Sequence, residues 1–166
     1  MKNIFLIGYM GSGKSSVATY MAGKYGMEVL EMDEMIADRE EMSIADIFAK
    51  QGEEYFRNVE TILLQEICSQ ENKVISCGGG VVLRSDNVEM MKKRGTIVLL
   101  SARPETILER VKDDTSRPLL QGNKTVEYIC EMMDKRREYY EHAAEIMVWT
   151  DGKQIAEICS EIFEQI

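Results

Sequence analysis

Residues 8–15, Gly-Tyr-Met-Gly-Ser-Gly-Lys-Ser, restrict the possible folds of this chain more than any other segment. They match the pattern G-x-x-x-x-G-K-[ST], in which a glycine-rich loop wraps around phosphate oxygens. The pattern is informative only between a strand and a helix, and here an apolar run at residues 4–7 precedes it and a helical pattern at residues 16–25 follows. A tight bend alone requires neither three glycines nor an adjacent Lys-Ser pair. The loop therefore predicts a nucleoside triphosphate site.

The chemistry of this loop assigns roles to individual residues. Glycines let successive backbone N–H groups turn inward, and the following helix directs its N-terminal partial positive charge at the phosphates. We expect Lys14 to reach the β and γ phosphates and the Ser15 hydroxyl to bind Mg²⁺, so ATP and Mg²⁺ are the predicted cofactors. The predicted nucleotide-binding residues of the loop are Gly11, Ser12, Gly13, Lys14, Ser15 and Ser16.

Short apolar runs alternate with longer helical patterns along the whole chain. The predicted strands are Asn3–Ile7, Glu28–Glu31, Lys73–Ser76, residues 96–100 and residues 146–150. This alternation predicts a three-layer α/β/α fold, a parallel sheet with helices on both faces. A last amphipathic helix is expected at residues 153–165. With 166 residues and 45% hydrophobic content, one domain spanning residues 1–166 is expected.

Charge and cysteine content disfavour several classes of function. A formal net charge of −9 at pH 7 argues against a nucleic-acid binder, which needs a basic face. The four cysteines form no C-x-x-C pair and follow no signal peptide, so we expect reduced, mostly buried thiols and a cytoplasmic protein. No apolar run approaches the roughly 18 residues of a membrane span, so no membrane association is expected. Any anionic ligand must then be bound by locally placed Arg, Lys and N–H groups, against the overall negative charge.

Two segments are longer than ordinary connections between strands. Residues 43–69 form a helical insertion that starts with a hydroxyl at Ser43 and a carboxylate at Asp46, a typical helix cap. Residues 112–124 are polar and contain Arg117. Insertions on a rigid sheet usually provide specificity or act as lids. We expect a substrate-binding insertion within residues 33–62 and a lid at residues 112–124, whose Arg117 would swing over the phosphates.

Two further features lie where strands are predicted to end. Gly78, Gly79 and Gly80 follow the third strand, and their N–H groups would permit close approach of a substrate, although a glycine run is also typical of a flexible turn. Asp33 follows the second strand, where a carboxylate could orient and deprotonate an attacking hydroxyl. The alternative for Asp33 is a simple N-cap of a helix at residues 35–39.

Basic residues on two helical segments are ambiguous from their pattern alone. Arg57 has Glu53 four residues before it and Glu60 three after, so by itself it resembles an exposed helix face with a weak ion pair. Residues 135–140, Lys-Arg-Arg-Glu-Tyr-Tyr, are either an anion clamp or an ordinary charged helix face.

Taken together, these motifs resemble the shikimate kinases over nearly the whole chain. The phosphate loop is shared by many proteins, but Phe56-Arg57 followed by Glu60, a triple-glycine loop and an Arg-Pro-Leu-Leu segment at residues 117–120 are far more specific. The resemblance implies transfer of the ATP γ-phosphoryl group to the 3-hydroxyl of shikimate, a step toward chorismate and the aromatic amino acids. It also implies the nucleoside monophosphate kinase-like fold, with five parallel strands in the order 2-3-1-4-5.

The same resemblance implies roles for residues. Arg57 and Arg136 would bind the shikimate carboxylate, with Glu60 holding Arg57 in position. Asp33 would contact the ring hydroxyls and act as the base, and the loop of Gly78, Gly79 and Gly80 would contact the substrate. At the nucleotide, the implied residues are Arg110, Arg117 and Lys153.

This chain departs from the family pattern at three places. Glu31-Met32-Asp33 stands where the family usually has Asp-x-Asp, so a glutamate would occupy the outer shell of the magnesium ion. Glu138 replaces a usual proline, and Glu141 replaces a usual basic residue. These two departures leave Arg136 and Arg137 as alternatives for the carboxylate ligand, with register favouring Arg136. Other possibilities are a gluconate or nucleoside monophosphate kinase of the same fold, or a nucleotide-binding module without transferase activity. A monomer is expected.

The substitution Asp33→Asn tests whether the Asp33 carboxylate acts as the base. If the carboxylate accepts the proton of the acceptor hydroxyl, this variant should still bind ATP but turn over about 100-fold more slowly or worse. Steady-state kinetics together with nucleotide titration check this. Near-normal turnover would remove Asp33 from the mechanism.

Overall fold

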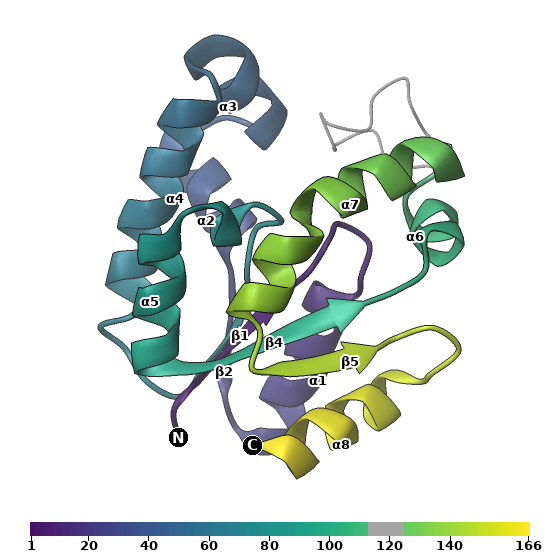
Figure 1. The fold of residues 1–166 in the computed structure, drawn as a ribbon. Helices are drawn as coiled ribbons and strands as arrows, with labels where there is room; N and C mark the ends of the chain where they lie inside the picture. The colour runs from purple at the N-terminus through teal and green to yellow at the C-terminus, as the bar shows by residue number, and fades with distance from the viewer. Residues whose placement is uncertain (113–124) are drawn as a thin grey trace.

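The computed structural model describes residues 1–112 and 125–166, which build a five-stranded sheet flanked by helices (Figure 1). The strands are β1 (Asn3–Ile7), β2 (Glu28–Glu31), β3 (Lys73–Ser76), β4 (Gly95–Ser101) and β5 (Ile146–Trp149). All pairings are parallel, and the order β2-β3-β1-β4-β5 is the predicted one. The predicted strand ranges are confirmed within one residue at each end.

The sheet is covered on both faces because residues 4–7 of its central strand are all apolar. Every residue of β1 is buried, and alternate side chains enter different clusters. Phe5 and Ile7 pack on one face, whereas Ile4 and Leu6 pack on the other. Successive side chains of a strand point to opposite faces of the sheet, so a strand with apolar side chains on both faces must be covered by helices on both sides.

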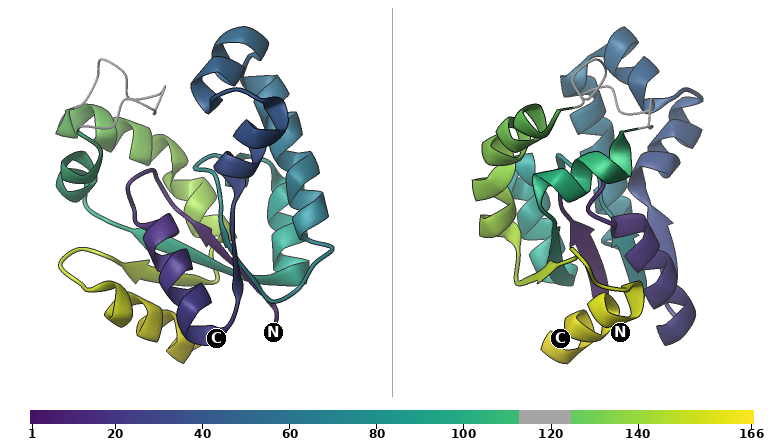
Figure 2. Two further views of the ribbon diagram at one scale, coloured as in Figure 1. Left: turned by 180° about the vertical axis from the view of Figure 1, so that it is seen from behind. Right: turned by 90° about the vertical axis from the view of Figure 1, so that its right-hand side faces the viewer.

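The two faces carry different helices. On one face, α1 (Lys14–Tyr25) and α8 (Ile155–Gln165) lie together, and Tyr25 stacks on Phe163 with 3.6 Å between ring centroids (Figure 2). On the other face lie α4 (Glu53–Ile67), α5 (Ser85–Arg94) and α7 (Val126–Ala143), which share the larger apolar cluster.

The remaining helices lie toward the carboxyl ends of the strands. They are α2 (Met32–Glu40), α3 (Ile44–Gln51), the 3₁₀ turn η1 (Val81–Leu83) and α6 (Pro104–Val111). The predicted cap of α3 is confirmed, since the Ser43 hydroxyl accepts a hydrogen bond from the N–H of Asp46 at 3.1 Å. The alternative of Asp33 as an N-cap is wrong, because α2 already begins at Met32 and Glu31 occupies the cap position. Asp33 therefore lies in the first turn of the helix, at the edge of the sheet.

The cysteines behave as expected from the sequence. All four are free thiols; Cys68, Cys77 and Cys159 are buried and Cys130 is half-buried. None of the helices within residues 1–112 and 125–166 has the length and apolar content needed to cross a bilayer.

The close contact of β1 and β4 generates a stability prediction. A Cβ atom on Gly95 would lie 2.1 Å from the backbone oxygen of Asn3, so Gly95→Ala must push two paired strands apart. We expect the free energy of unfolding to fall by about 1–3 kcal/mol.

The matched control is Gly23→Ala, at an exposed position inside α1 where a Cβ would meet nothing within 4 Å. This substitution should raise the free energy of unfolding by about 0.5–1 kcal/mol, because alanine loses less backbone entropy in a helix than glycine. Urea denaturation measures both. Equal effects of the two substitutions would contradict the strand-contact argument.

Candidate active site

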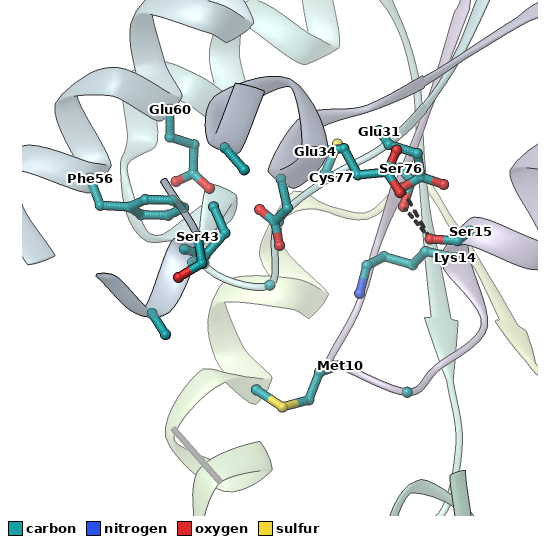
Figure 3. A pocket seen from close by; sticks show the side chains of 18 of the residues that line it. Met10, Lys14, Ser15, Glu31, Glu34, Ser43, Phe56, Glu60, Ser76 and Cys77 are labelled. Atoms are coloured by element: carbon teal, nitrogen blue, oxygen red, sulfur yellow. Dashed lines mark hydrogen bonds between the residues drawn. The ribbon is translucent and has the colours of Figure 1, made fainter. Parts of the chain in front are cut away.

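A cavity of about 850 Å³ opens at the carboxyl edge of the sheet. Figure 3 shows Lys14 and Ser15 on one side of it and Phe56 and Glu60 on the other. The cavity therefore connects the phosphate loop with the helical insertion. The predicted site residues that line it are Gly11, Gly13, Lys14, Ser15, Ser16, Asp33, Arg57, Gly78, Gly79, Gly80, Arg110 and Arg136.

The phosphate loop adopts a conformation that depends on glycine. Gly8, Gly11 and Gly13 have φ angles of 145°, 77° and 101°, which side chains on L-residues disfavour. Gly13 precedes the first residue of α1 and supplies no side-chain cap, so the N–H groups of the first turn face the loop interior as an anion site requires. Lys14 Nζ donates to the carbonyl oxygens of Gly8 at 2.8 Å and Tyr9 at 3.2 Å, which holds its ammonium over the loop.

Ser15 has oxygen-bearing neighbours suited to a hard cation. Its hydroxyl donates to Glu31 Oε2 at 3.0 Å and lies 3.5 Å from Ser76 Oγ (Figure 3). Hydroxyl and carboxylate oxygens are the ligands and outer-shell partners that Mg²⁺ prefers. The residues present thus fit a magnesium ion, and the glutamate at position 31 keeps a carboxylate within reach of it.

Two carboxylates flank Gly78 in the centre of the cavity. A Cβ atom on Gly78 would lie 2.7 Å from Glu60 Oε2 and 3.0 Å from Asp33 Oδ1, so only glycine leaves both in place. Within the described part of the chain, neither of these buried oxygens has a hydrogen-bond partner. Burial raises the pKa of Glu60, and the positive charge of Arg57 opposes that rise. Asp33 Oδ1 is therefore available to a ligand hydroxyl.

Arg57 lies inside the protein, so its interpretation as an exposed helix face is wrong. Its residue exposure is 8%, and its Nη1 lies 3.0 Å from Oε1 of the fully buried Glu60. Its Nη2 is 3.4 Å from Oε1 of the exposed Glu53. The guanidinium occupies the space above Gly80, where a Cβ would come within 2.5 Å of it. Packing of α4 against the glycine loop thus turns a helix-surface pattern into a buried ion pair at the cavity.

The structure distinguishes the two arginines that the sequence left as alternatives. Arg136 is 8% exposed and lines the cavity, with Nη1 3.2 Å from the position of a Cβ on Gly79. Arg137 is exposed and forms an ion pair with Asp134 at 2.6 Å. Because consecutive residues of a helix point about 100° apart, only one of the two can face the cavity.

The structure brings only some of the residues expected at the nucleotide, Arg110, Arg117 and Lys153, into the cavity. Arg110 lines the cavity and donates to the carbonyl oxygen of Gly11 at 2.9 Å and to Thr150 Oγ1 at 3.2 Å. Lys153 lies outside the cavity lining and pairs with Glu161 at 2.7 Å. Arg117 and nearly all of the expected lid fall outside the described residues.

Ser12 lies inside the phosphate loop and not on its surface. Its side chain is buried, and its hydroxyl has no hydrogen-bond partner among the described residues. A Cβ on Gly8 would come within 2.9 Å of that hydroxyl. Of the loop residues predicted to bind nucleotide, Ser12 is the one that does not line the cavity.

Sequence reasoning missed the apolar wall of the cavity. The apolar residues that line the cavity are Met10 from the phosphate loop and Ala37, Ile44, Ala45, Phe48 and Phe56 from the helical insertion and α2. The rings of Phe48 and Phe56 lie 4.9 Å apart between centroids, which joins α3 to α4. The helical spacing marked Phe56 as apolar, but spacing does not show whether an apolar side chain borders a core or a cavity.

Comparison with known proteins gives the family. The shikimate kinase family model matches residues 10–166. A shikimate kinase of Persephonella marina is 40% identical over 166 residues, covering 100% of this chain and 99% of the relative. The chain belongs to the shikimate kinase family. A second relative, the shikimate kinase of Dehalococcoides mccartyi, is 38% identical over 99% of this chain and 93% of its own length.

Solved structures agree with this assignment. A shikimate kinase from Acinetobacter baumannii in complex with shikimate has a TM-score of 0.93 and 32% identity, covering 99% of this chain and 92% of that chain. A gluconokinase from Sinorhizobium meliloti has a TM-score of 0.57 and 19% identity, covering 99% of this chain and 90% of that chain, which shows a shared fold alone. The family resemblance and the fold expected from it are confirmed.

The buried Arg57–Glu60 pair generates a stability prediction. Glu60→Gln removes the buried counter-charge of a guanidinium whose side chain is only 10% exposed. Breaking such a pair on one side should lower the free energy of unfolding by about 3 kcal/mol.

Glu53→Gln is the matched control, because Glu53 pairs with the same arginine while its own side chain is 59% exposed. It should stay within about 0.5 kcal/mol of the unsubstituted protein. Chemical denaturation of both variants at pH 7 makes the comparison. A Glu60 variant as stable as the Glu53 variant would show that the buried pair contributes nothing.

Proposed function

We propose that this protein transfers the γ-phosphoryl group of ATP to the 3-hydroxyl of shikimate, giving shikimate 3-phosphate on the route to chorismate and the aromatic amino acids. The observation that carries the proposal is a pair of guanidinium groups over the triple-glycine loop. Arg57 approaches Gly80 from α4, and Arg136 approaches Gly79 from α7. A forked guanidinium pairs bidentately with a planar carboxylate, so two of them beside one loop favour a carboxylate-bearing acceptor.

The nucleotide end of the cavity supports ATP and Mg²⁺ as partners of this acceptor. In the proposed complex, the loop of residues 11–16 surrounds the phosphates, Lys14 contacts the β and γ phosphates, and Arg110 lies against the base. Ser15 would hold the magnesium ion, with Glu31 in its outer shell. When bound, the ion neutralises charge on the phosphates during transfer.

Asp33 is proposed as the base that activates the acceptor. Its Oδ1 is buried beside Gly78 and unpaired within the described residues, so it can accept a hydrogen bond from a ring hydroxyl. As the hydroxyl oxygen attacks the γ phosphorus, its proton passes to Asp33, and ADP leaves with the electrons of the broken P–O bond. Glu60 has a different role, because its Oε1 is engaged by Arg57.

The remaining expectations belong to this proposal. Residues 33–62 form the substrate-binding insertion of a single domain spanning residues 1–166, and residues 112–124 form a lid whose Arg117 covers the phosphates. The turn that contains Lys153 borders the base. The proposed protein is a cytoplasmic monomer that binds neither nucleic acid nor membranes.

Two alternatives receive less support. A nucleoside monophosphate acceptor would need arginines for a second phosphate group, whereas the cavity's acceptor side offers Arg57 and Arg136 among the described residues. A gluconate kinase shares the fold, but identity at that level carries no information about the acceptor.

The deciding experiment measures ADP release by the purified protein with ATP and Mg²⁺. Shikimate, quinate, gluconate and a set of nucleoside monophosphates are supplied in separate reactions. Turnover with shikimate alone is the expected result. Turnover with another acceptor in place of shikimate would overturn the acceptor assignment, and no turnover at all would favour a binding module.

A pair of arginine variants tests the carboxylate contact. Arg136→Ala should raise the KM for shikimate by at least about 30-fold, because a desolvated charge pair is lost, while the KM for ATP stays nearly constant. Arg137→Ala, one residue along the same helix, removes only an exposed ion pair and should change either KM by less than about twofold. Equal effects of the two variants would argue against Arg136 as the carboxylate ligand.

A further inference from the structure

Tyr140 links α7 to the triple-glycine loop but has no role in the proposed chemistry. It lies four residues after Arg136, on the same face of α7, and is only 6% exposed. Its hydroxyl donates a hydrogen bond to the carbonyl oxygen of Gly79. The bond joins residues 61 positions apart, so it depends on the packing of α7 over the end of β3.

This bond adds a constraint to the Gly79–Gly80 peptide unit, which lies inside a turn closed by the Val81 N–H donating to the Gly78 carbonyl oxygen at 3.2 Å. The Gly79 carbonyl shares its rigid plane with the N–H of Gly80, so fixing the oxygen also fixes the direction of that N–H. Within the described residues, no group accepts a hydrogen bond from the N–H groups of Gly78, Gly79 or Gly80. Two glycines at the centre of such a turn still have access to several backbone conformations. The Tyr140 hydroxyl is therefore positioned to select one of them.

The same hydroxyl lies beside the Arg136 guanidinium. Arg136 Nη1 and Tyr140 Oη lie 3.2 Å and 3.8 Å from the position of a Cβ on Gly79, so the loop, the arginine and the tyrosine converge. Burial raises the pKa of Tyr140, and the charge and hydrogen bonding of Arg136 partly offset that rise. The hydroxyl consequently keeps its proton at neutral pH and can donate to Gly79 while its oxygen faces Arg136.

We propose that Tyr140 is a positioning residue that sets the Gly79–Gly80 peptide and the Arg136 guanidinium in one fixed arrangement for the acceptor carboxylate. This inference rests on the proposed function, because it assigns the carboxylate of shikimate to that arrangement. Tyr140 does not touch the reacting atoms. Its removal should therefore weaken binding of the acceptor and leave the nucleotide end of the cavity unchanged.

Tyr140→Phe keeps the ring in its packed position and deletes only the hydroxyl. Calorimetric titration of the complete protein with shikimate should show a Kd raised about 5- to 30-fold, the range expected when a buried carbonyl loses its donor. The Kd for ATP with Mg²⁺ should change by less than about twofold, because the phosphate loop lacks this contact. Tyr139→Phe is the matched control, since it deletes a hydroxyl from the adjacent, 48% exposed tyrosine. It should leave both constants unchanged.

A double-mutant cycle with Arg136 identifies the route of the effect. If Tyr140 acts through Arg136 and the loop, Tyr140→Phe should weaken shikimate binding much less in an Arg136→Ala background than alone. The penalty should also shrink for the methyl ester of shikimate, which lacks the negative charge. Fully additive effects, or an equal penalty for the ester, would overturn the proposal.

Other outcomes also separate this inference from the proposed function. A Tyr140→Phe variant that unfolds at lower temperature but binds shikimate normally would make Tyr140 purely structural and overturn this inference alone. Failure of the unsubstituted protein to bind or phosphorylate shikimate would overturn the proposed function and, with it, the role of Tyr140.

Discussion

Parallel pairing of the strands is the constraint on which the rest of this structure depends. Because β2, β3 and β1 run in the same direction, their carboxyl ends meet at one edge, although they are far apart in the sequence. The phosphate loop, Asp33 and the triple-glycine loop each follow one of these strands directly. In open α/β sheets ligands bind at this edge, where the strand order reverses. One backbone pattern thus brings the phosphate loop, the proposed base Asp33 and the triple-glycine loop to the same edge of the sheet.

The cavity places charges where the surrounding protein excludes water. Glu60 is fully buried and Arg57 nearly so, and each is acceptable there because the other neutralises it. Unpaired polar atoms remain on Asp33, Glu60, Ser12 and Arg57 within the described residues. Orphaned buried groups of this kind are uncommon in native proteins and concentrate where a ligand completes their hydrogen bonds. The unpaired oxygens of Asp33 and Glu60, which both lie beside Gly78, are consistent with a hydroxyl-rich acceptor.

Different features of the protein determine its fold and its choice of acceptor. A gluconokinase shares the architecture at 19% identity, so the sheet and the phosphate loop do not specify what is phosphorylated. Specificity must come from the side chains that the insertion and α7 direct into the cavity. Glycines at positions 78–80 contribute by being small, since each absent Cβ leaves room for a charged group from another element. This end of the cavity is therefore built by close packing of α4 and α7 around the three glycines.

Much of this protein is determined by local patterns in its sequence. The phosphate loop is contiguous, and apolar runs mark the strands because a buried parallel strand needs apolar side chains on both faces. The motifs also identified the family, and with it the order of the strands. Tertiary structure alone decided that Arg57 and Glu60 are buried and that Tyr140 reaches Gly79. It also shows that Arg136, which register already favoured over Arg137, faces the cavity. The reason is physical: helical spacing shows which residues share a face, but only the packing of distant elements shows what that face touches.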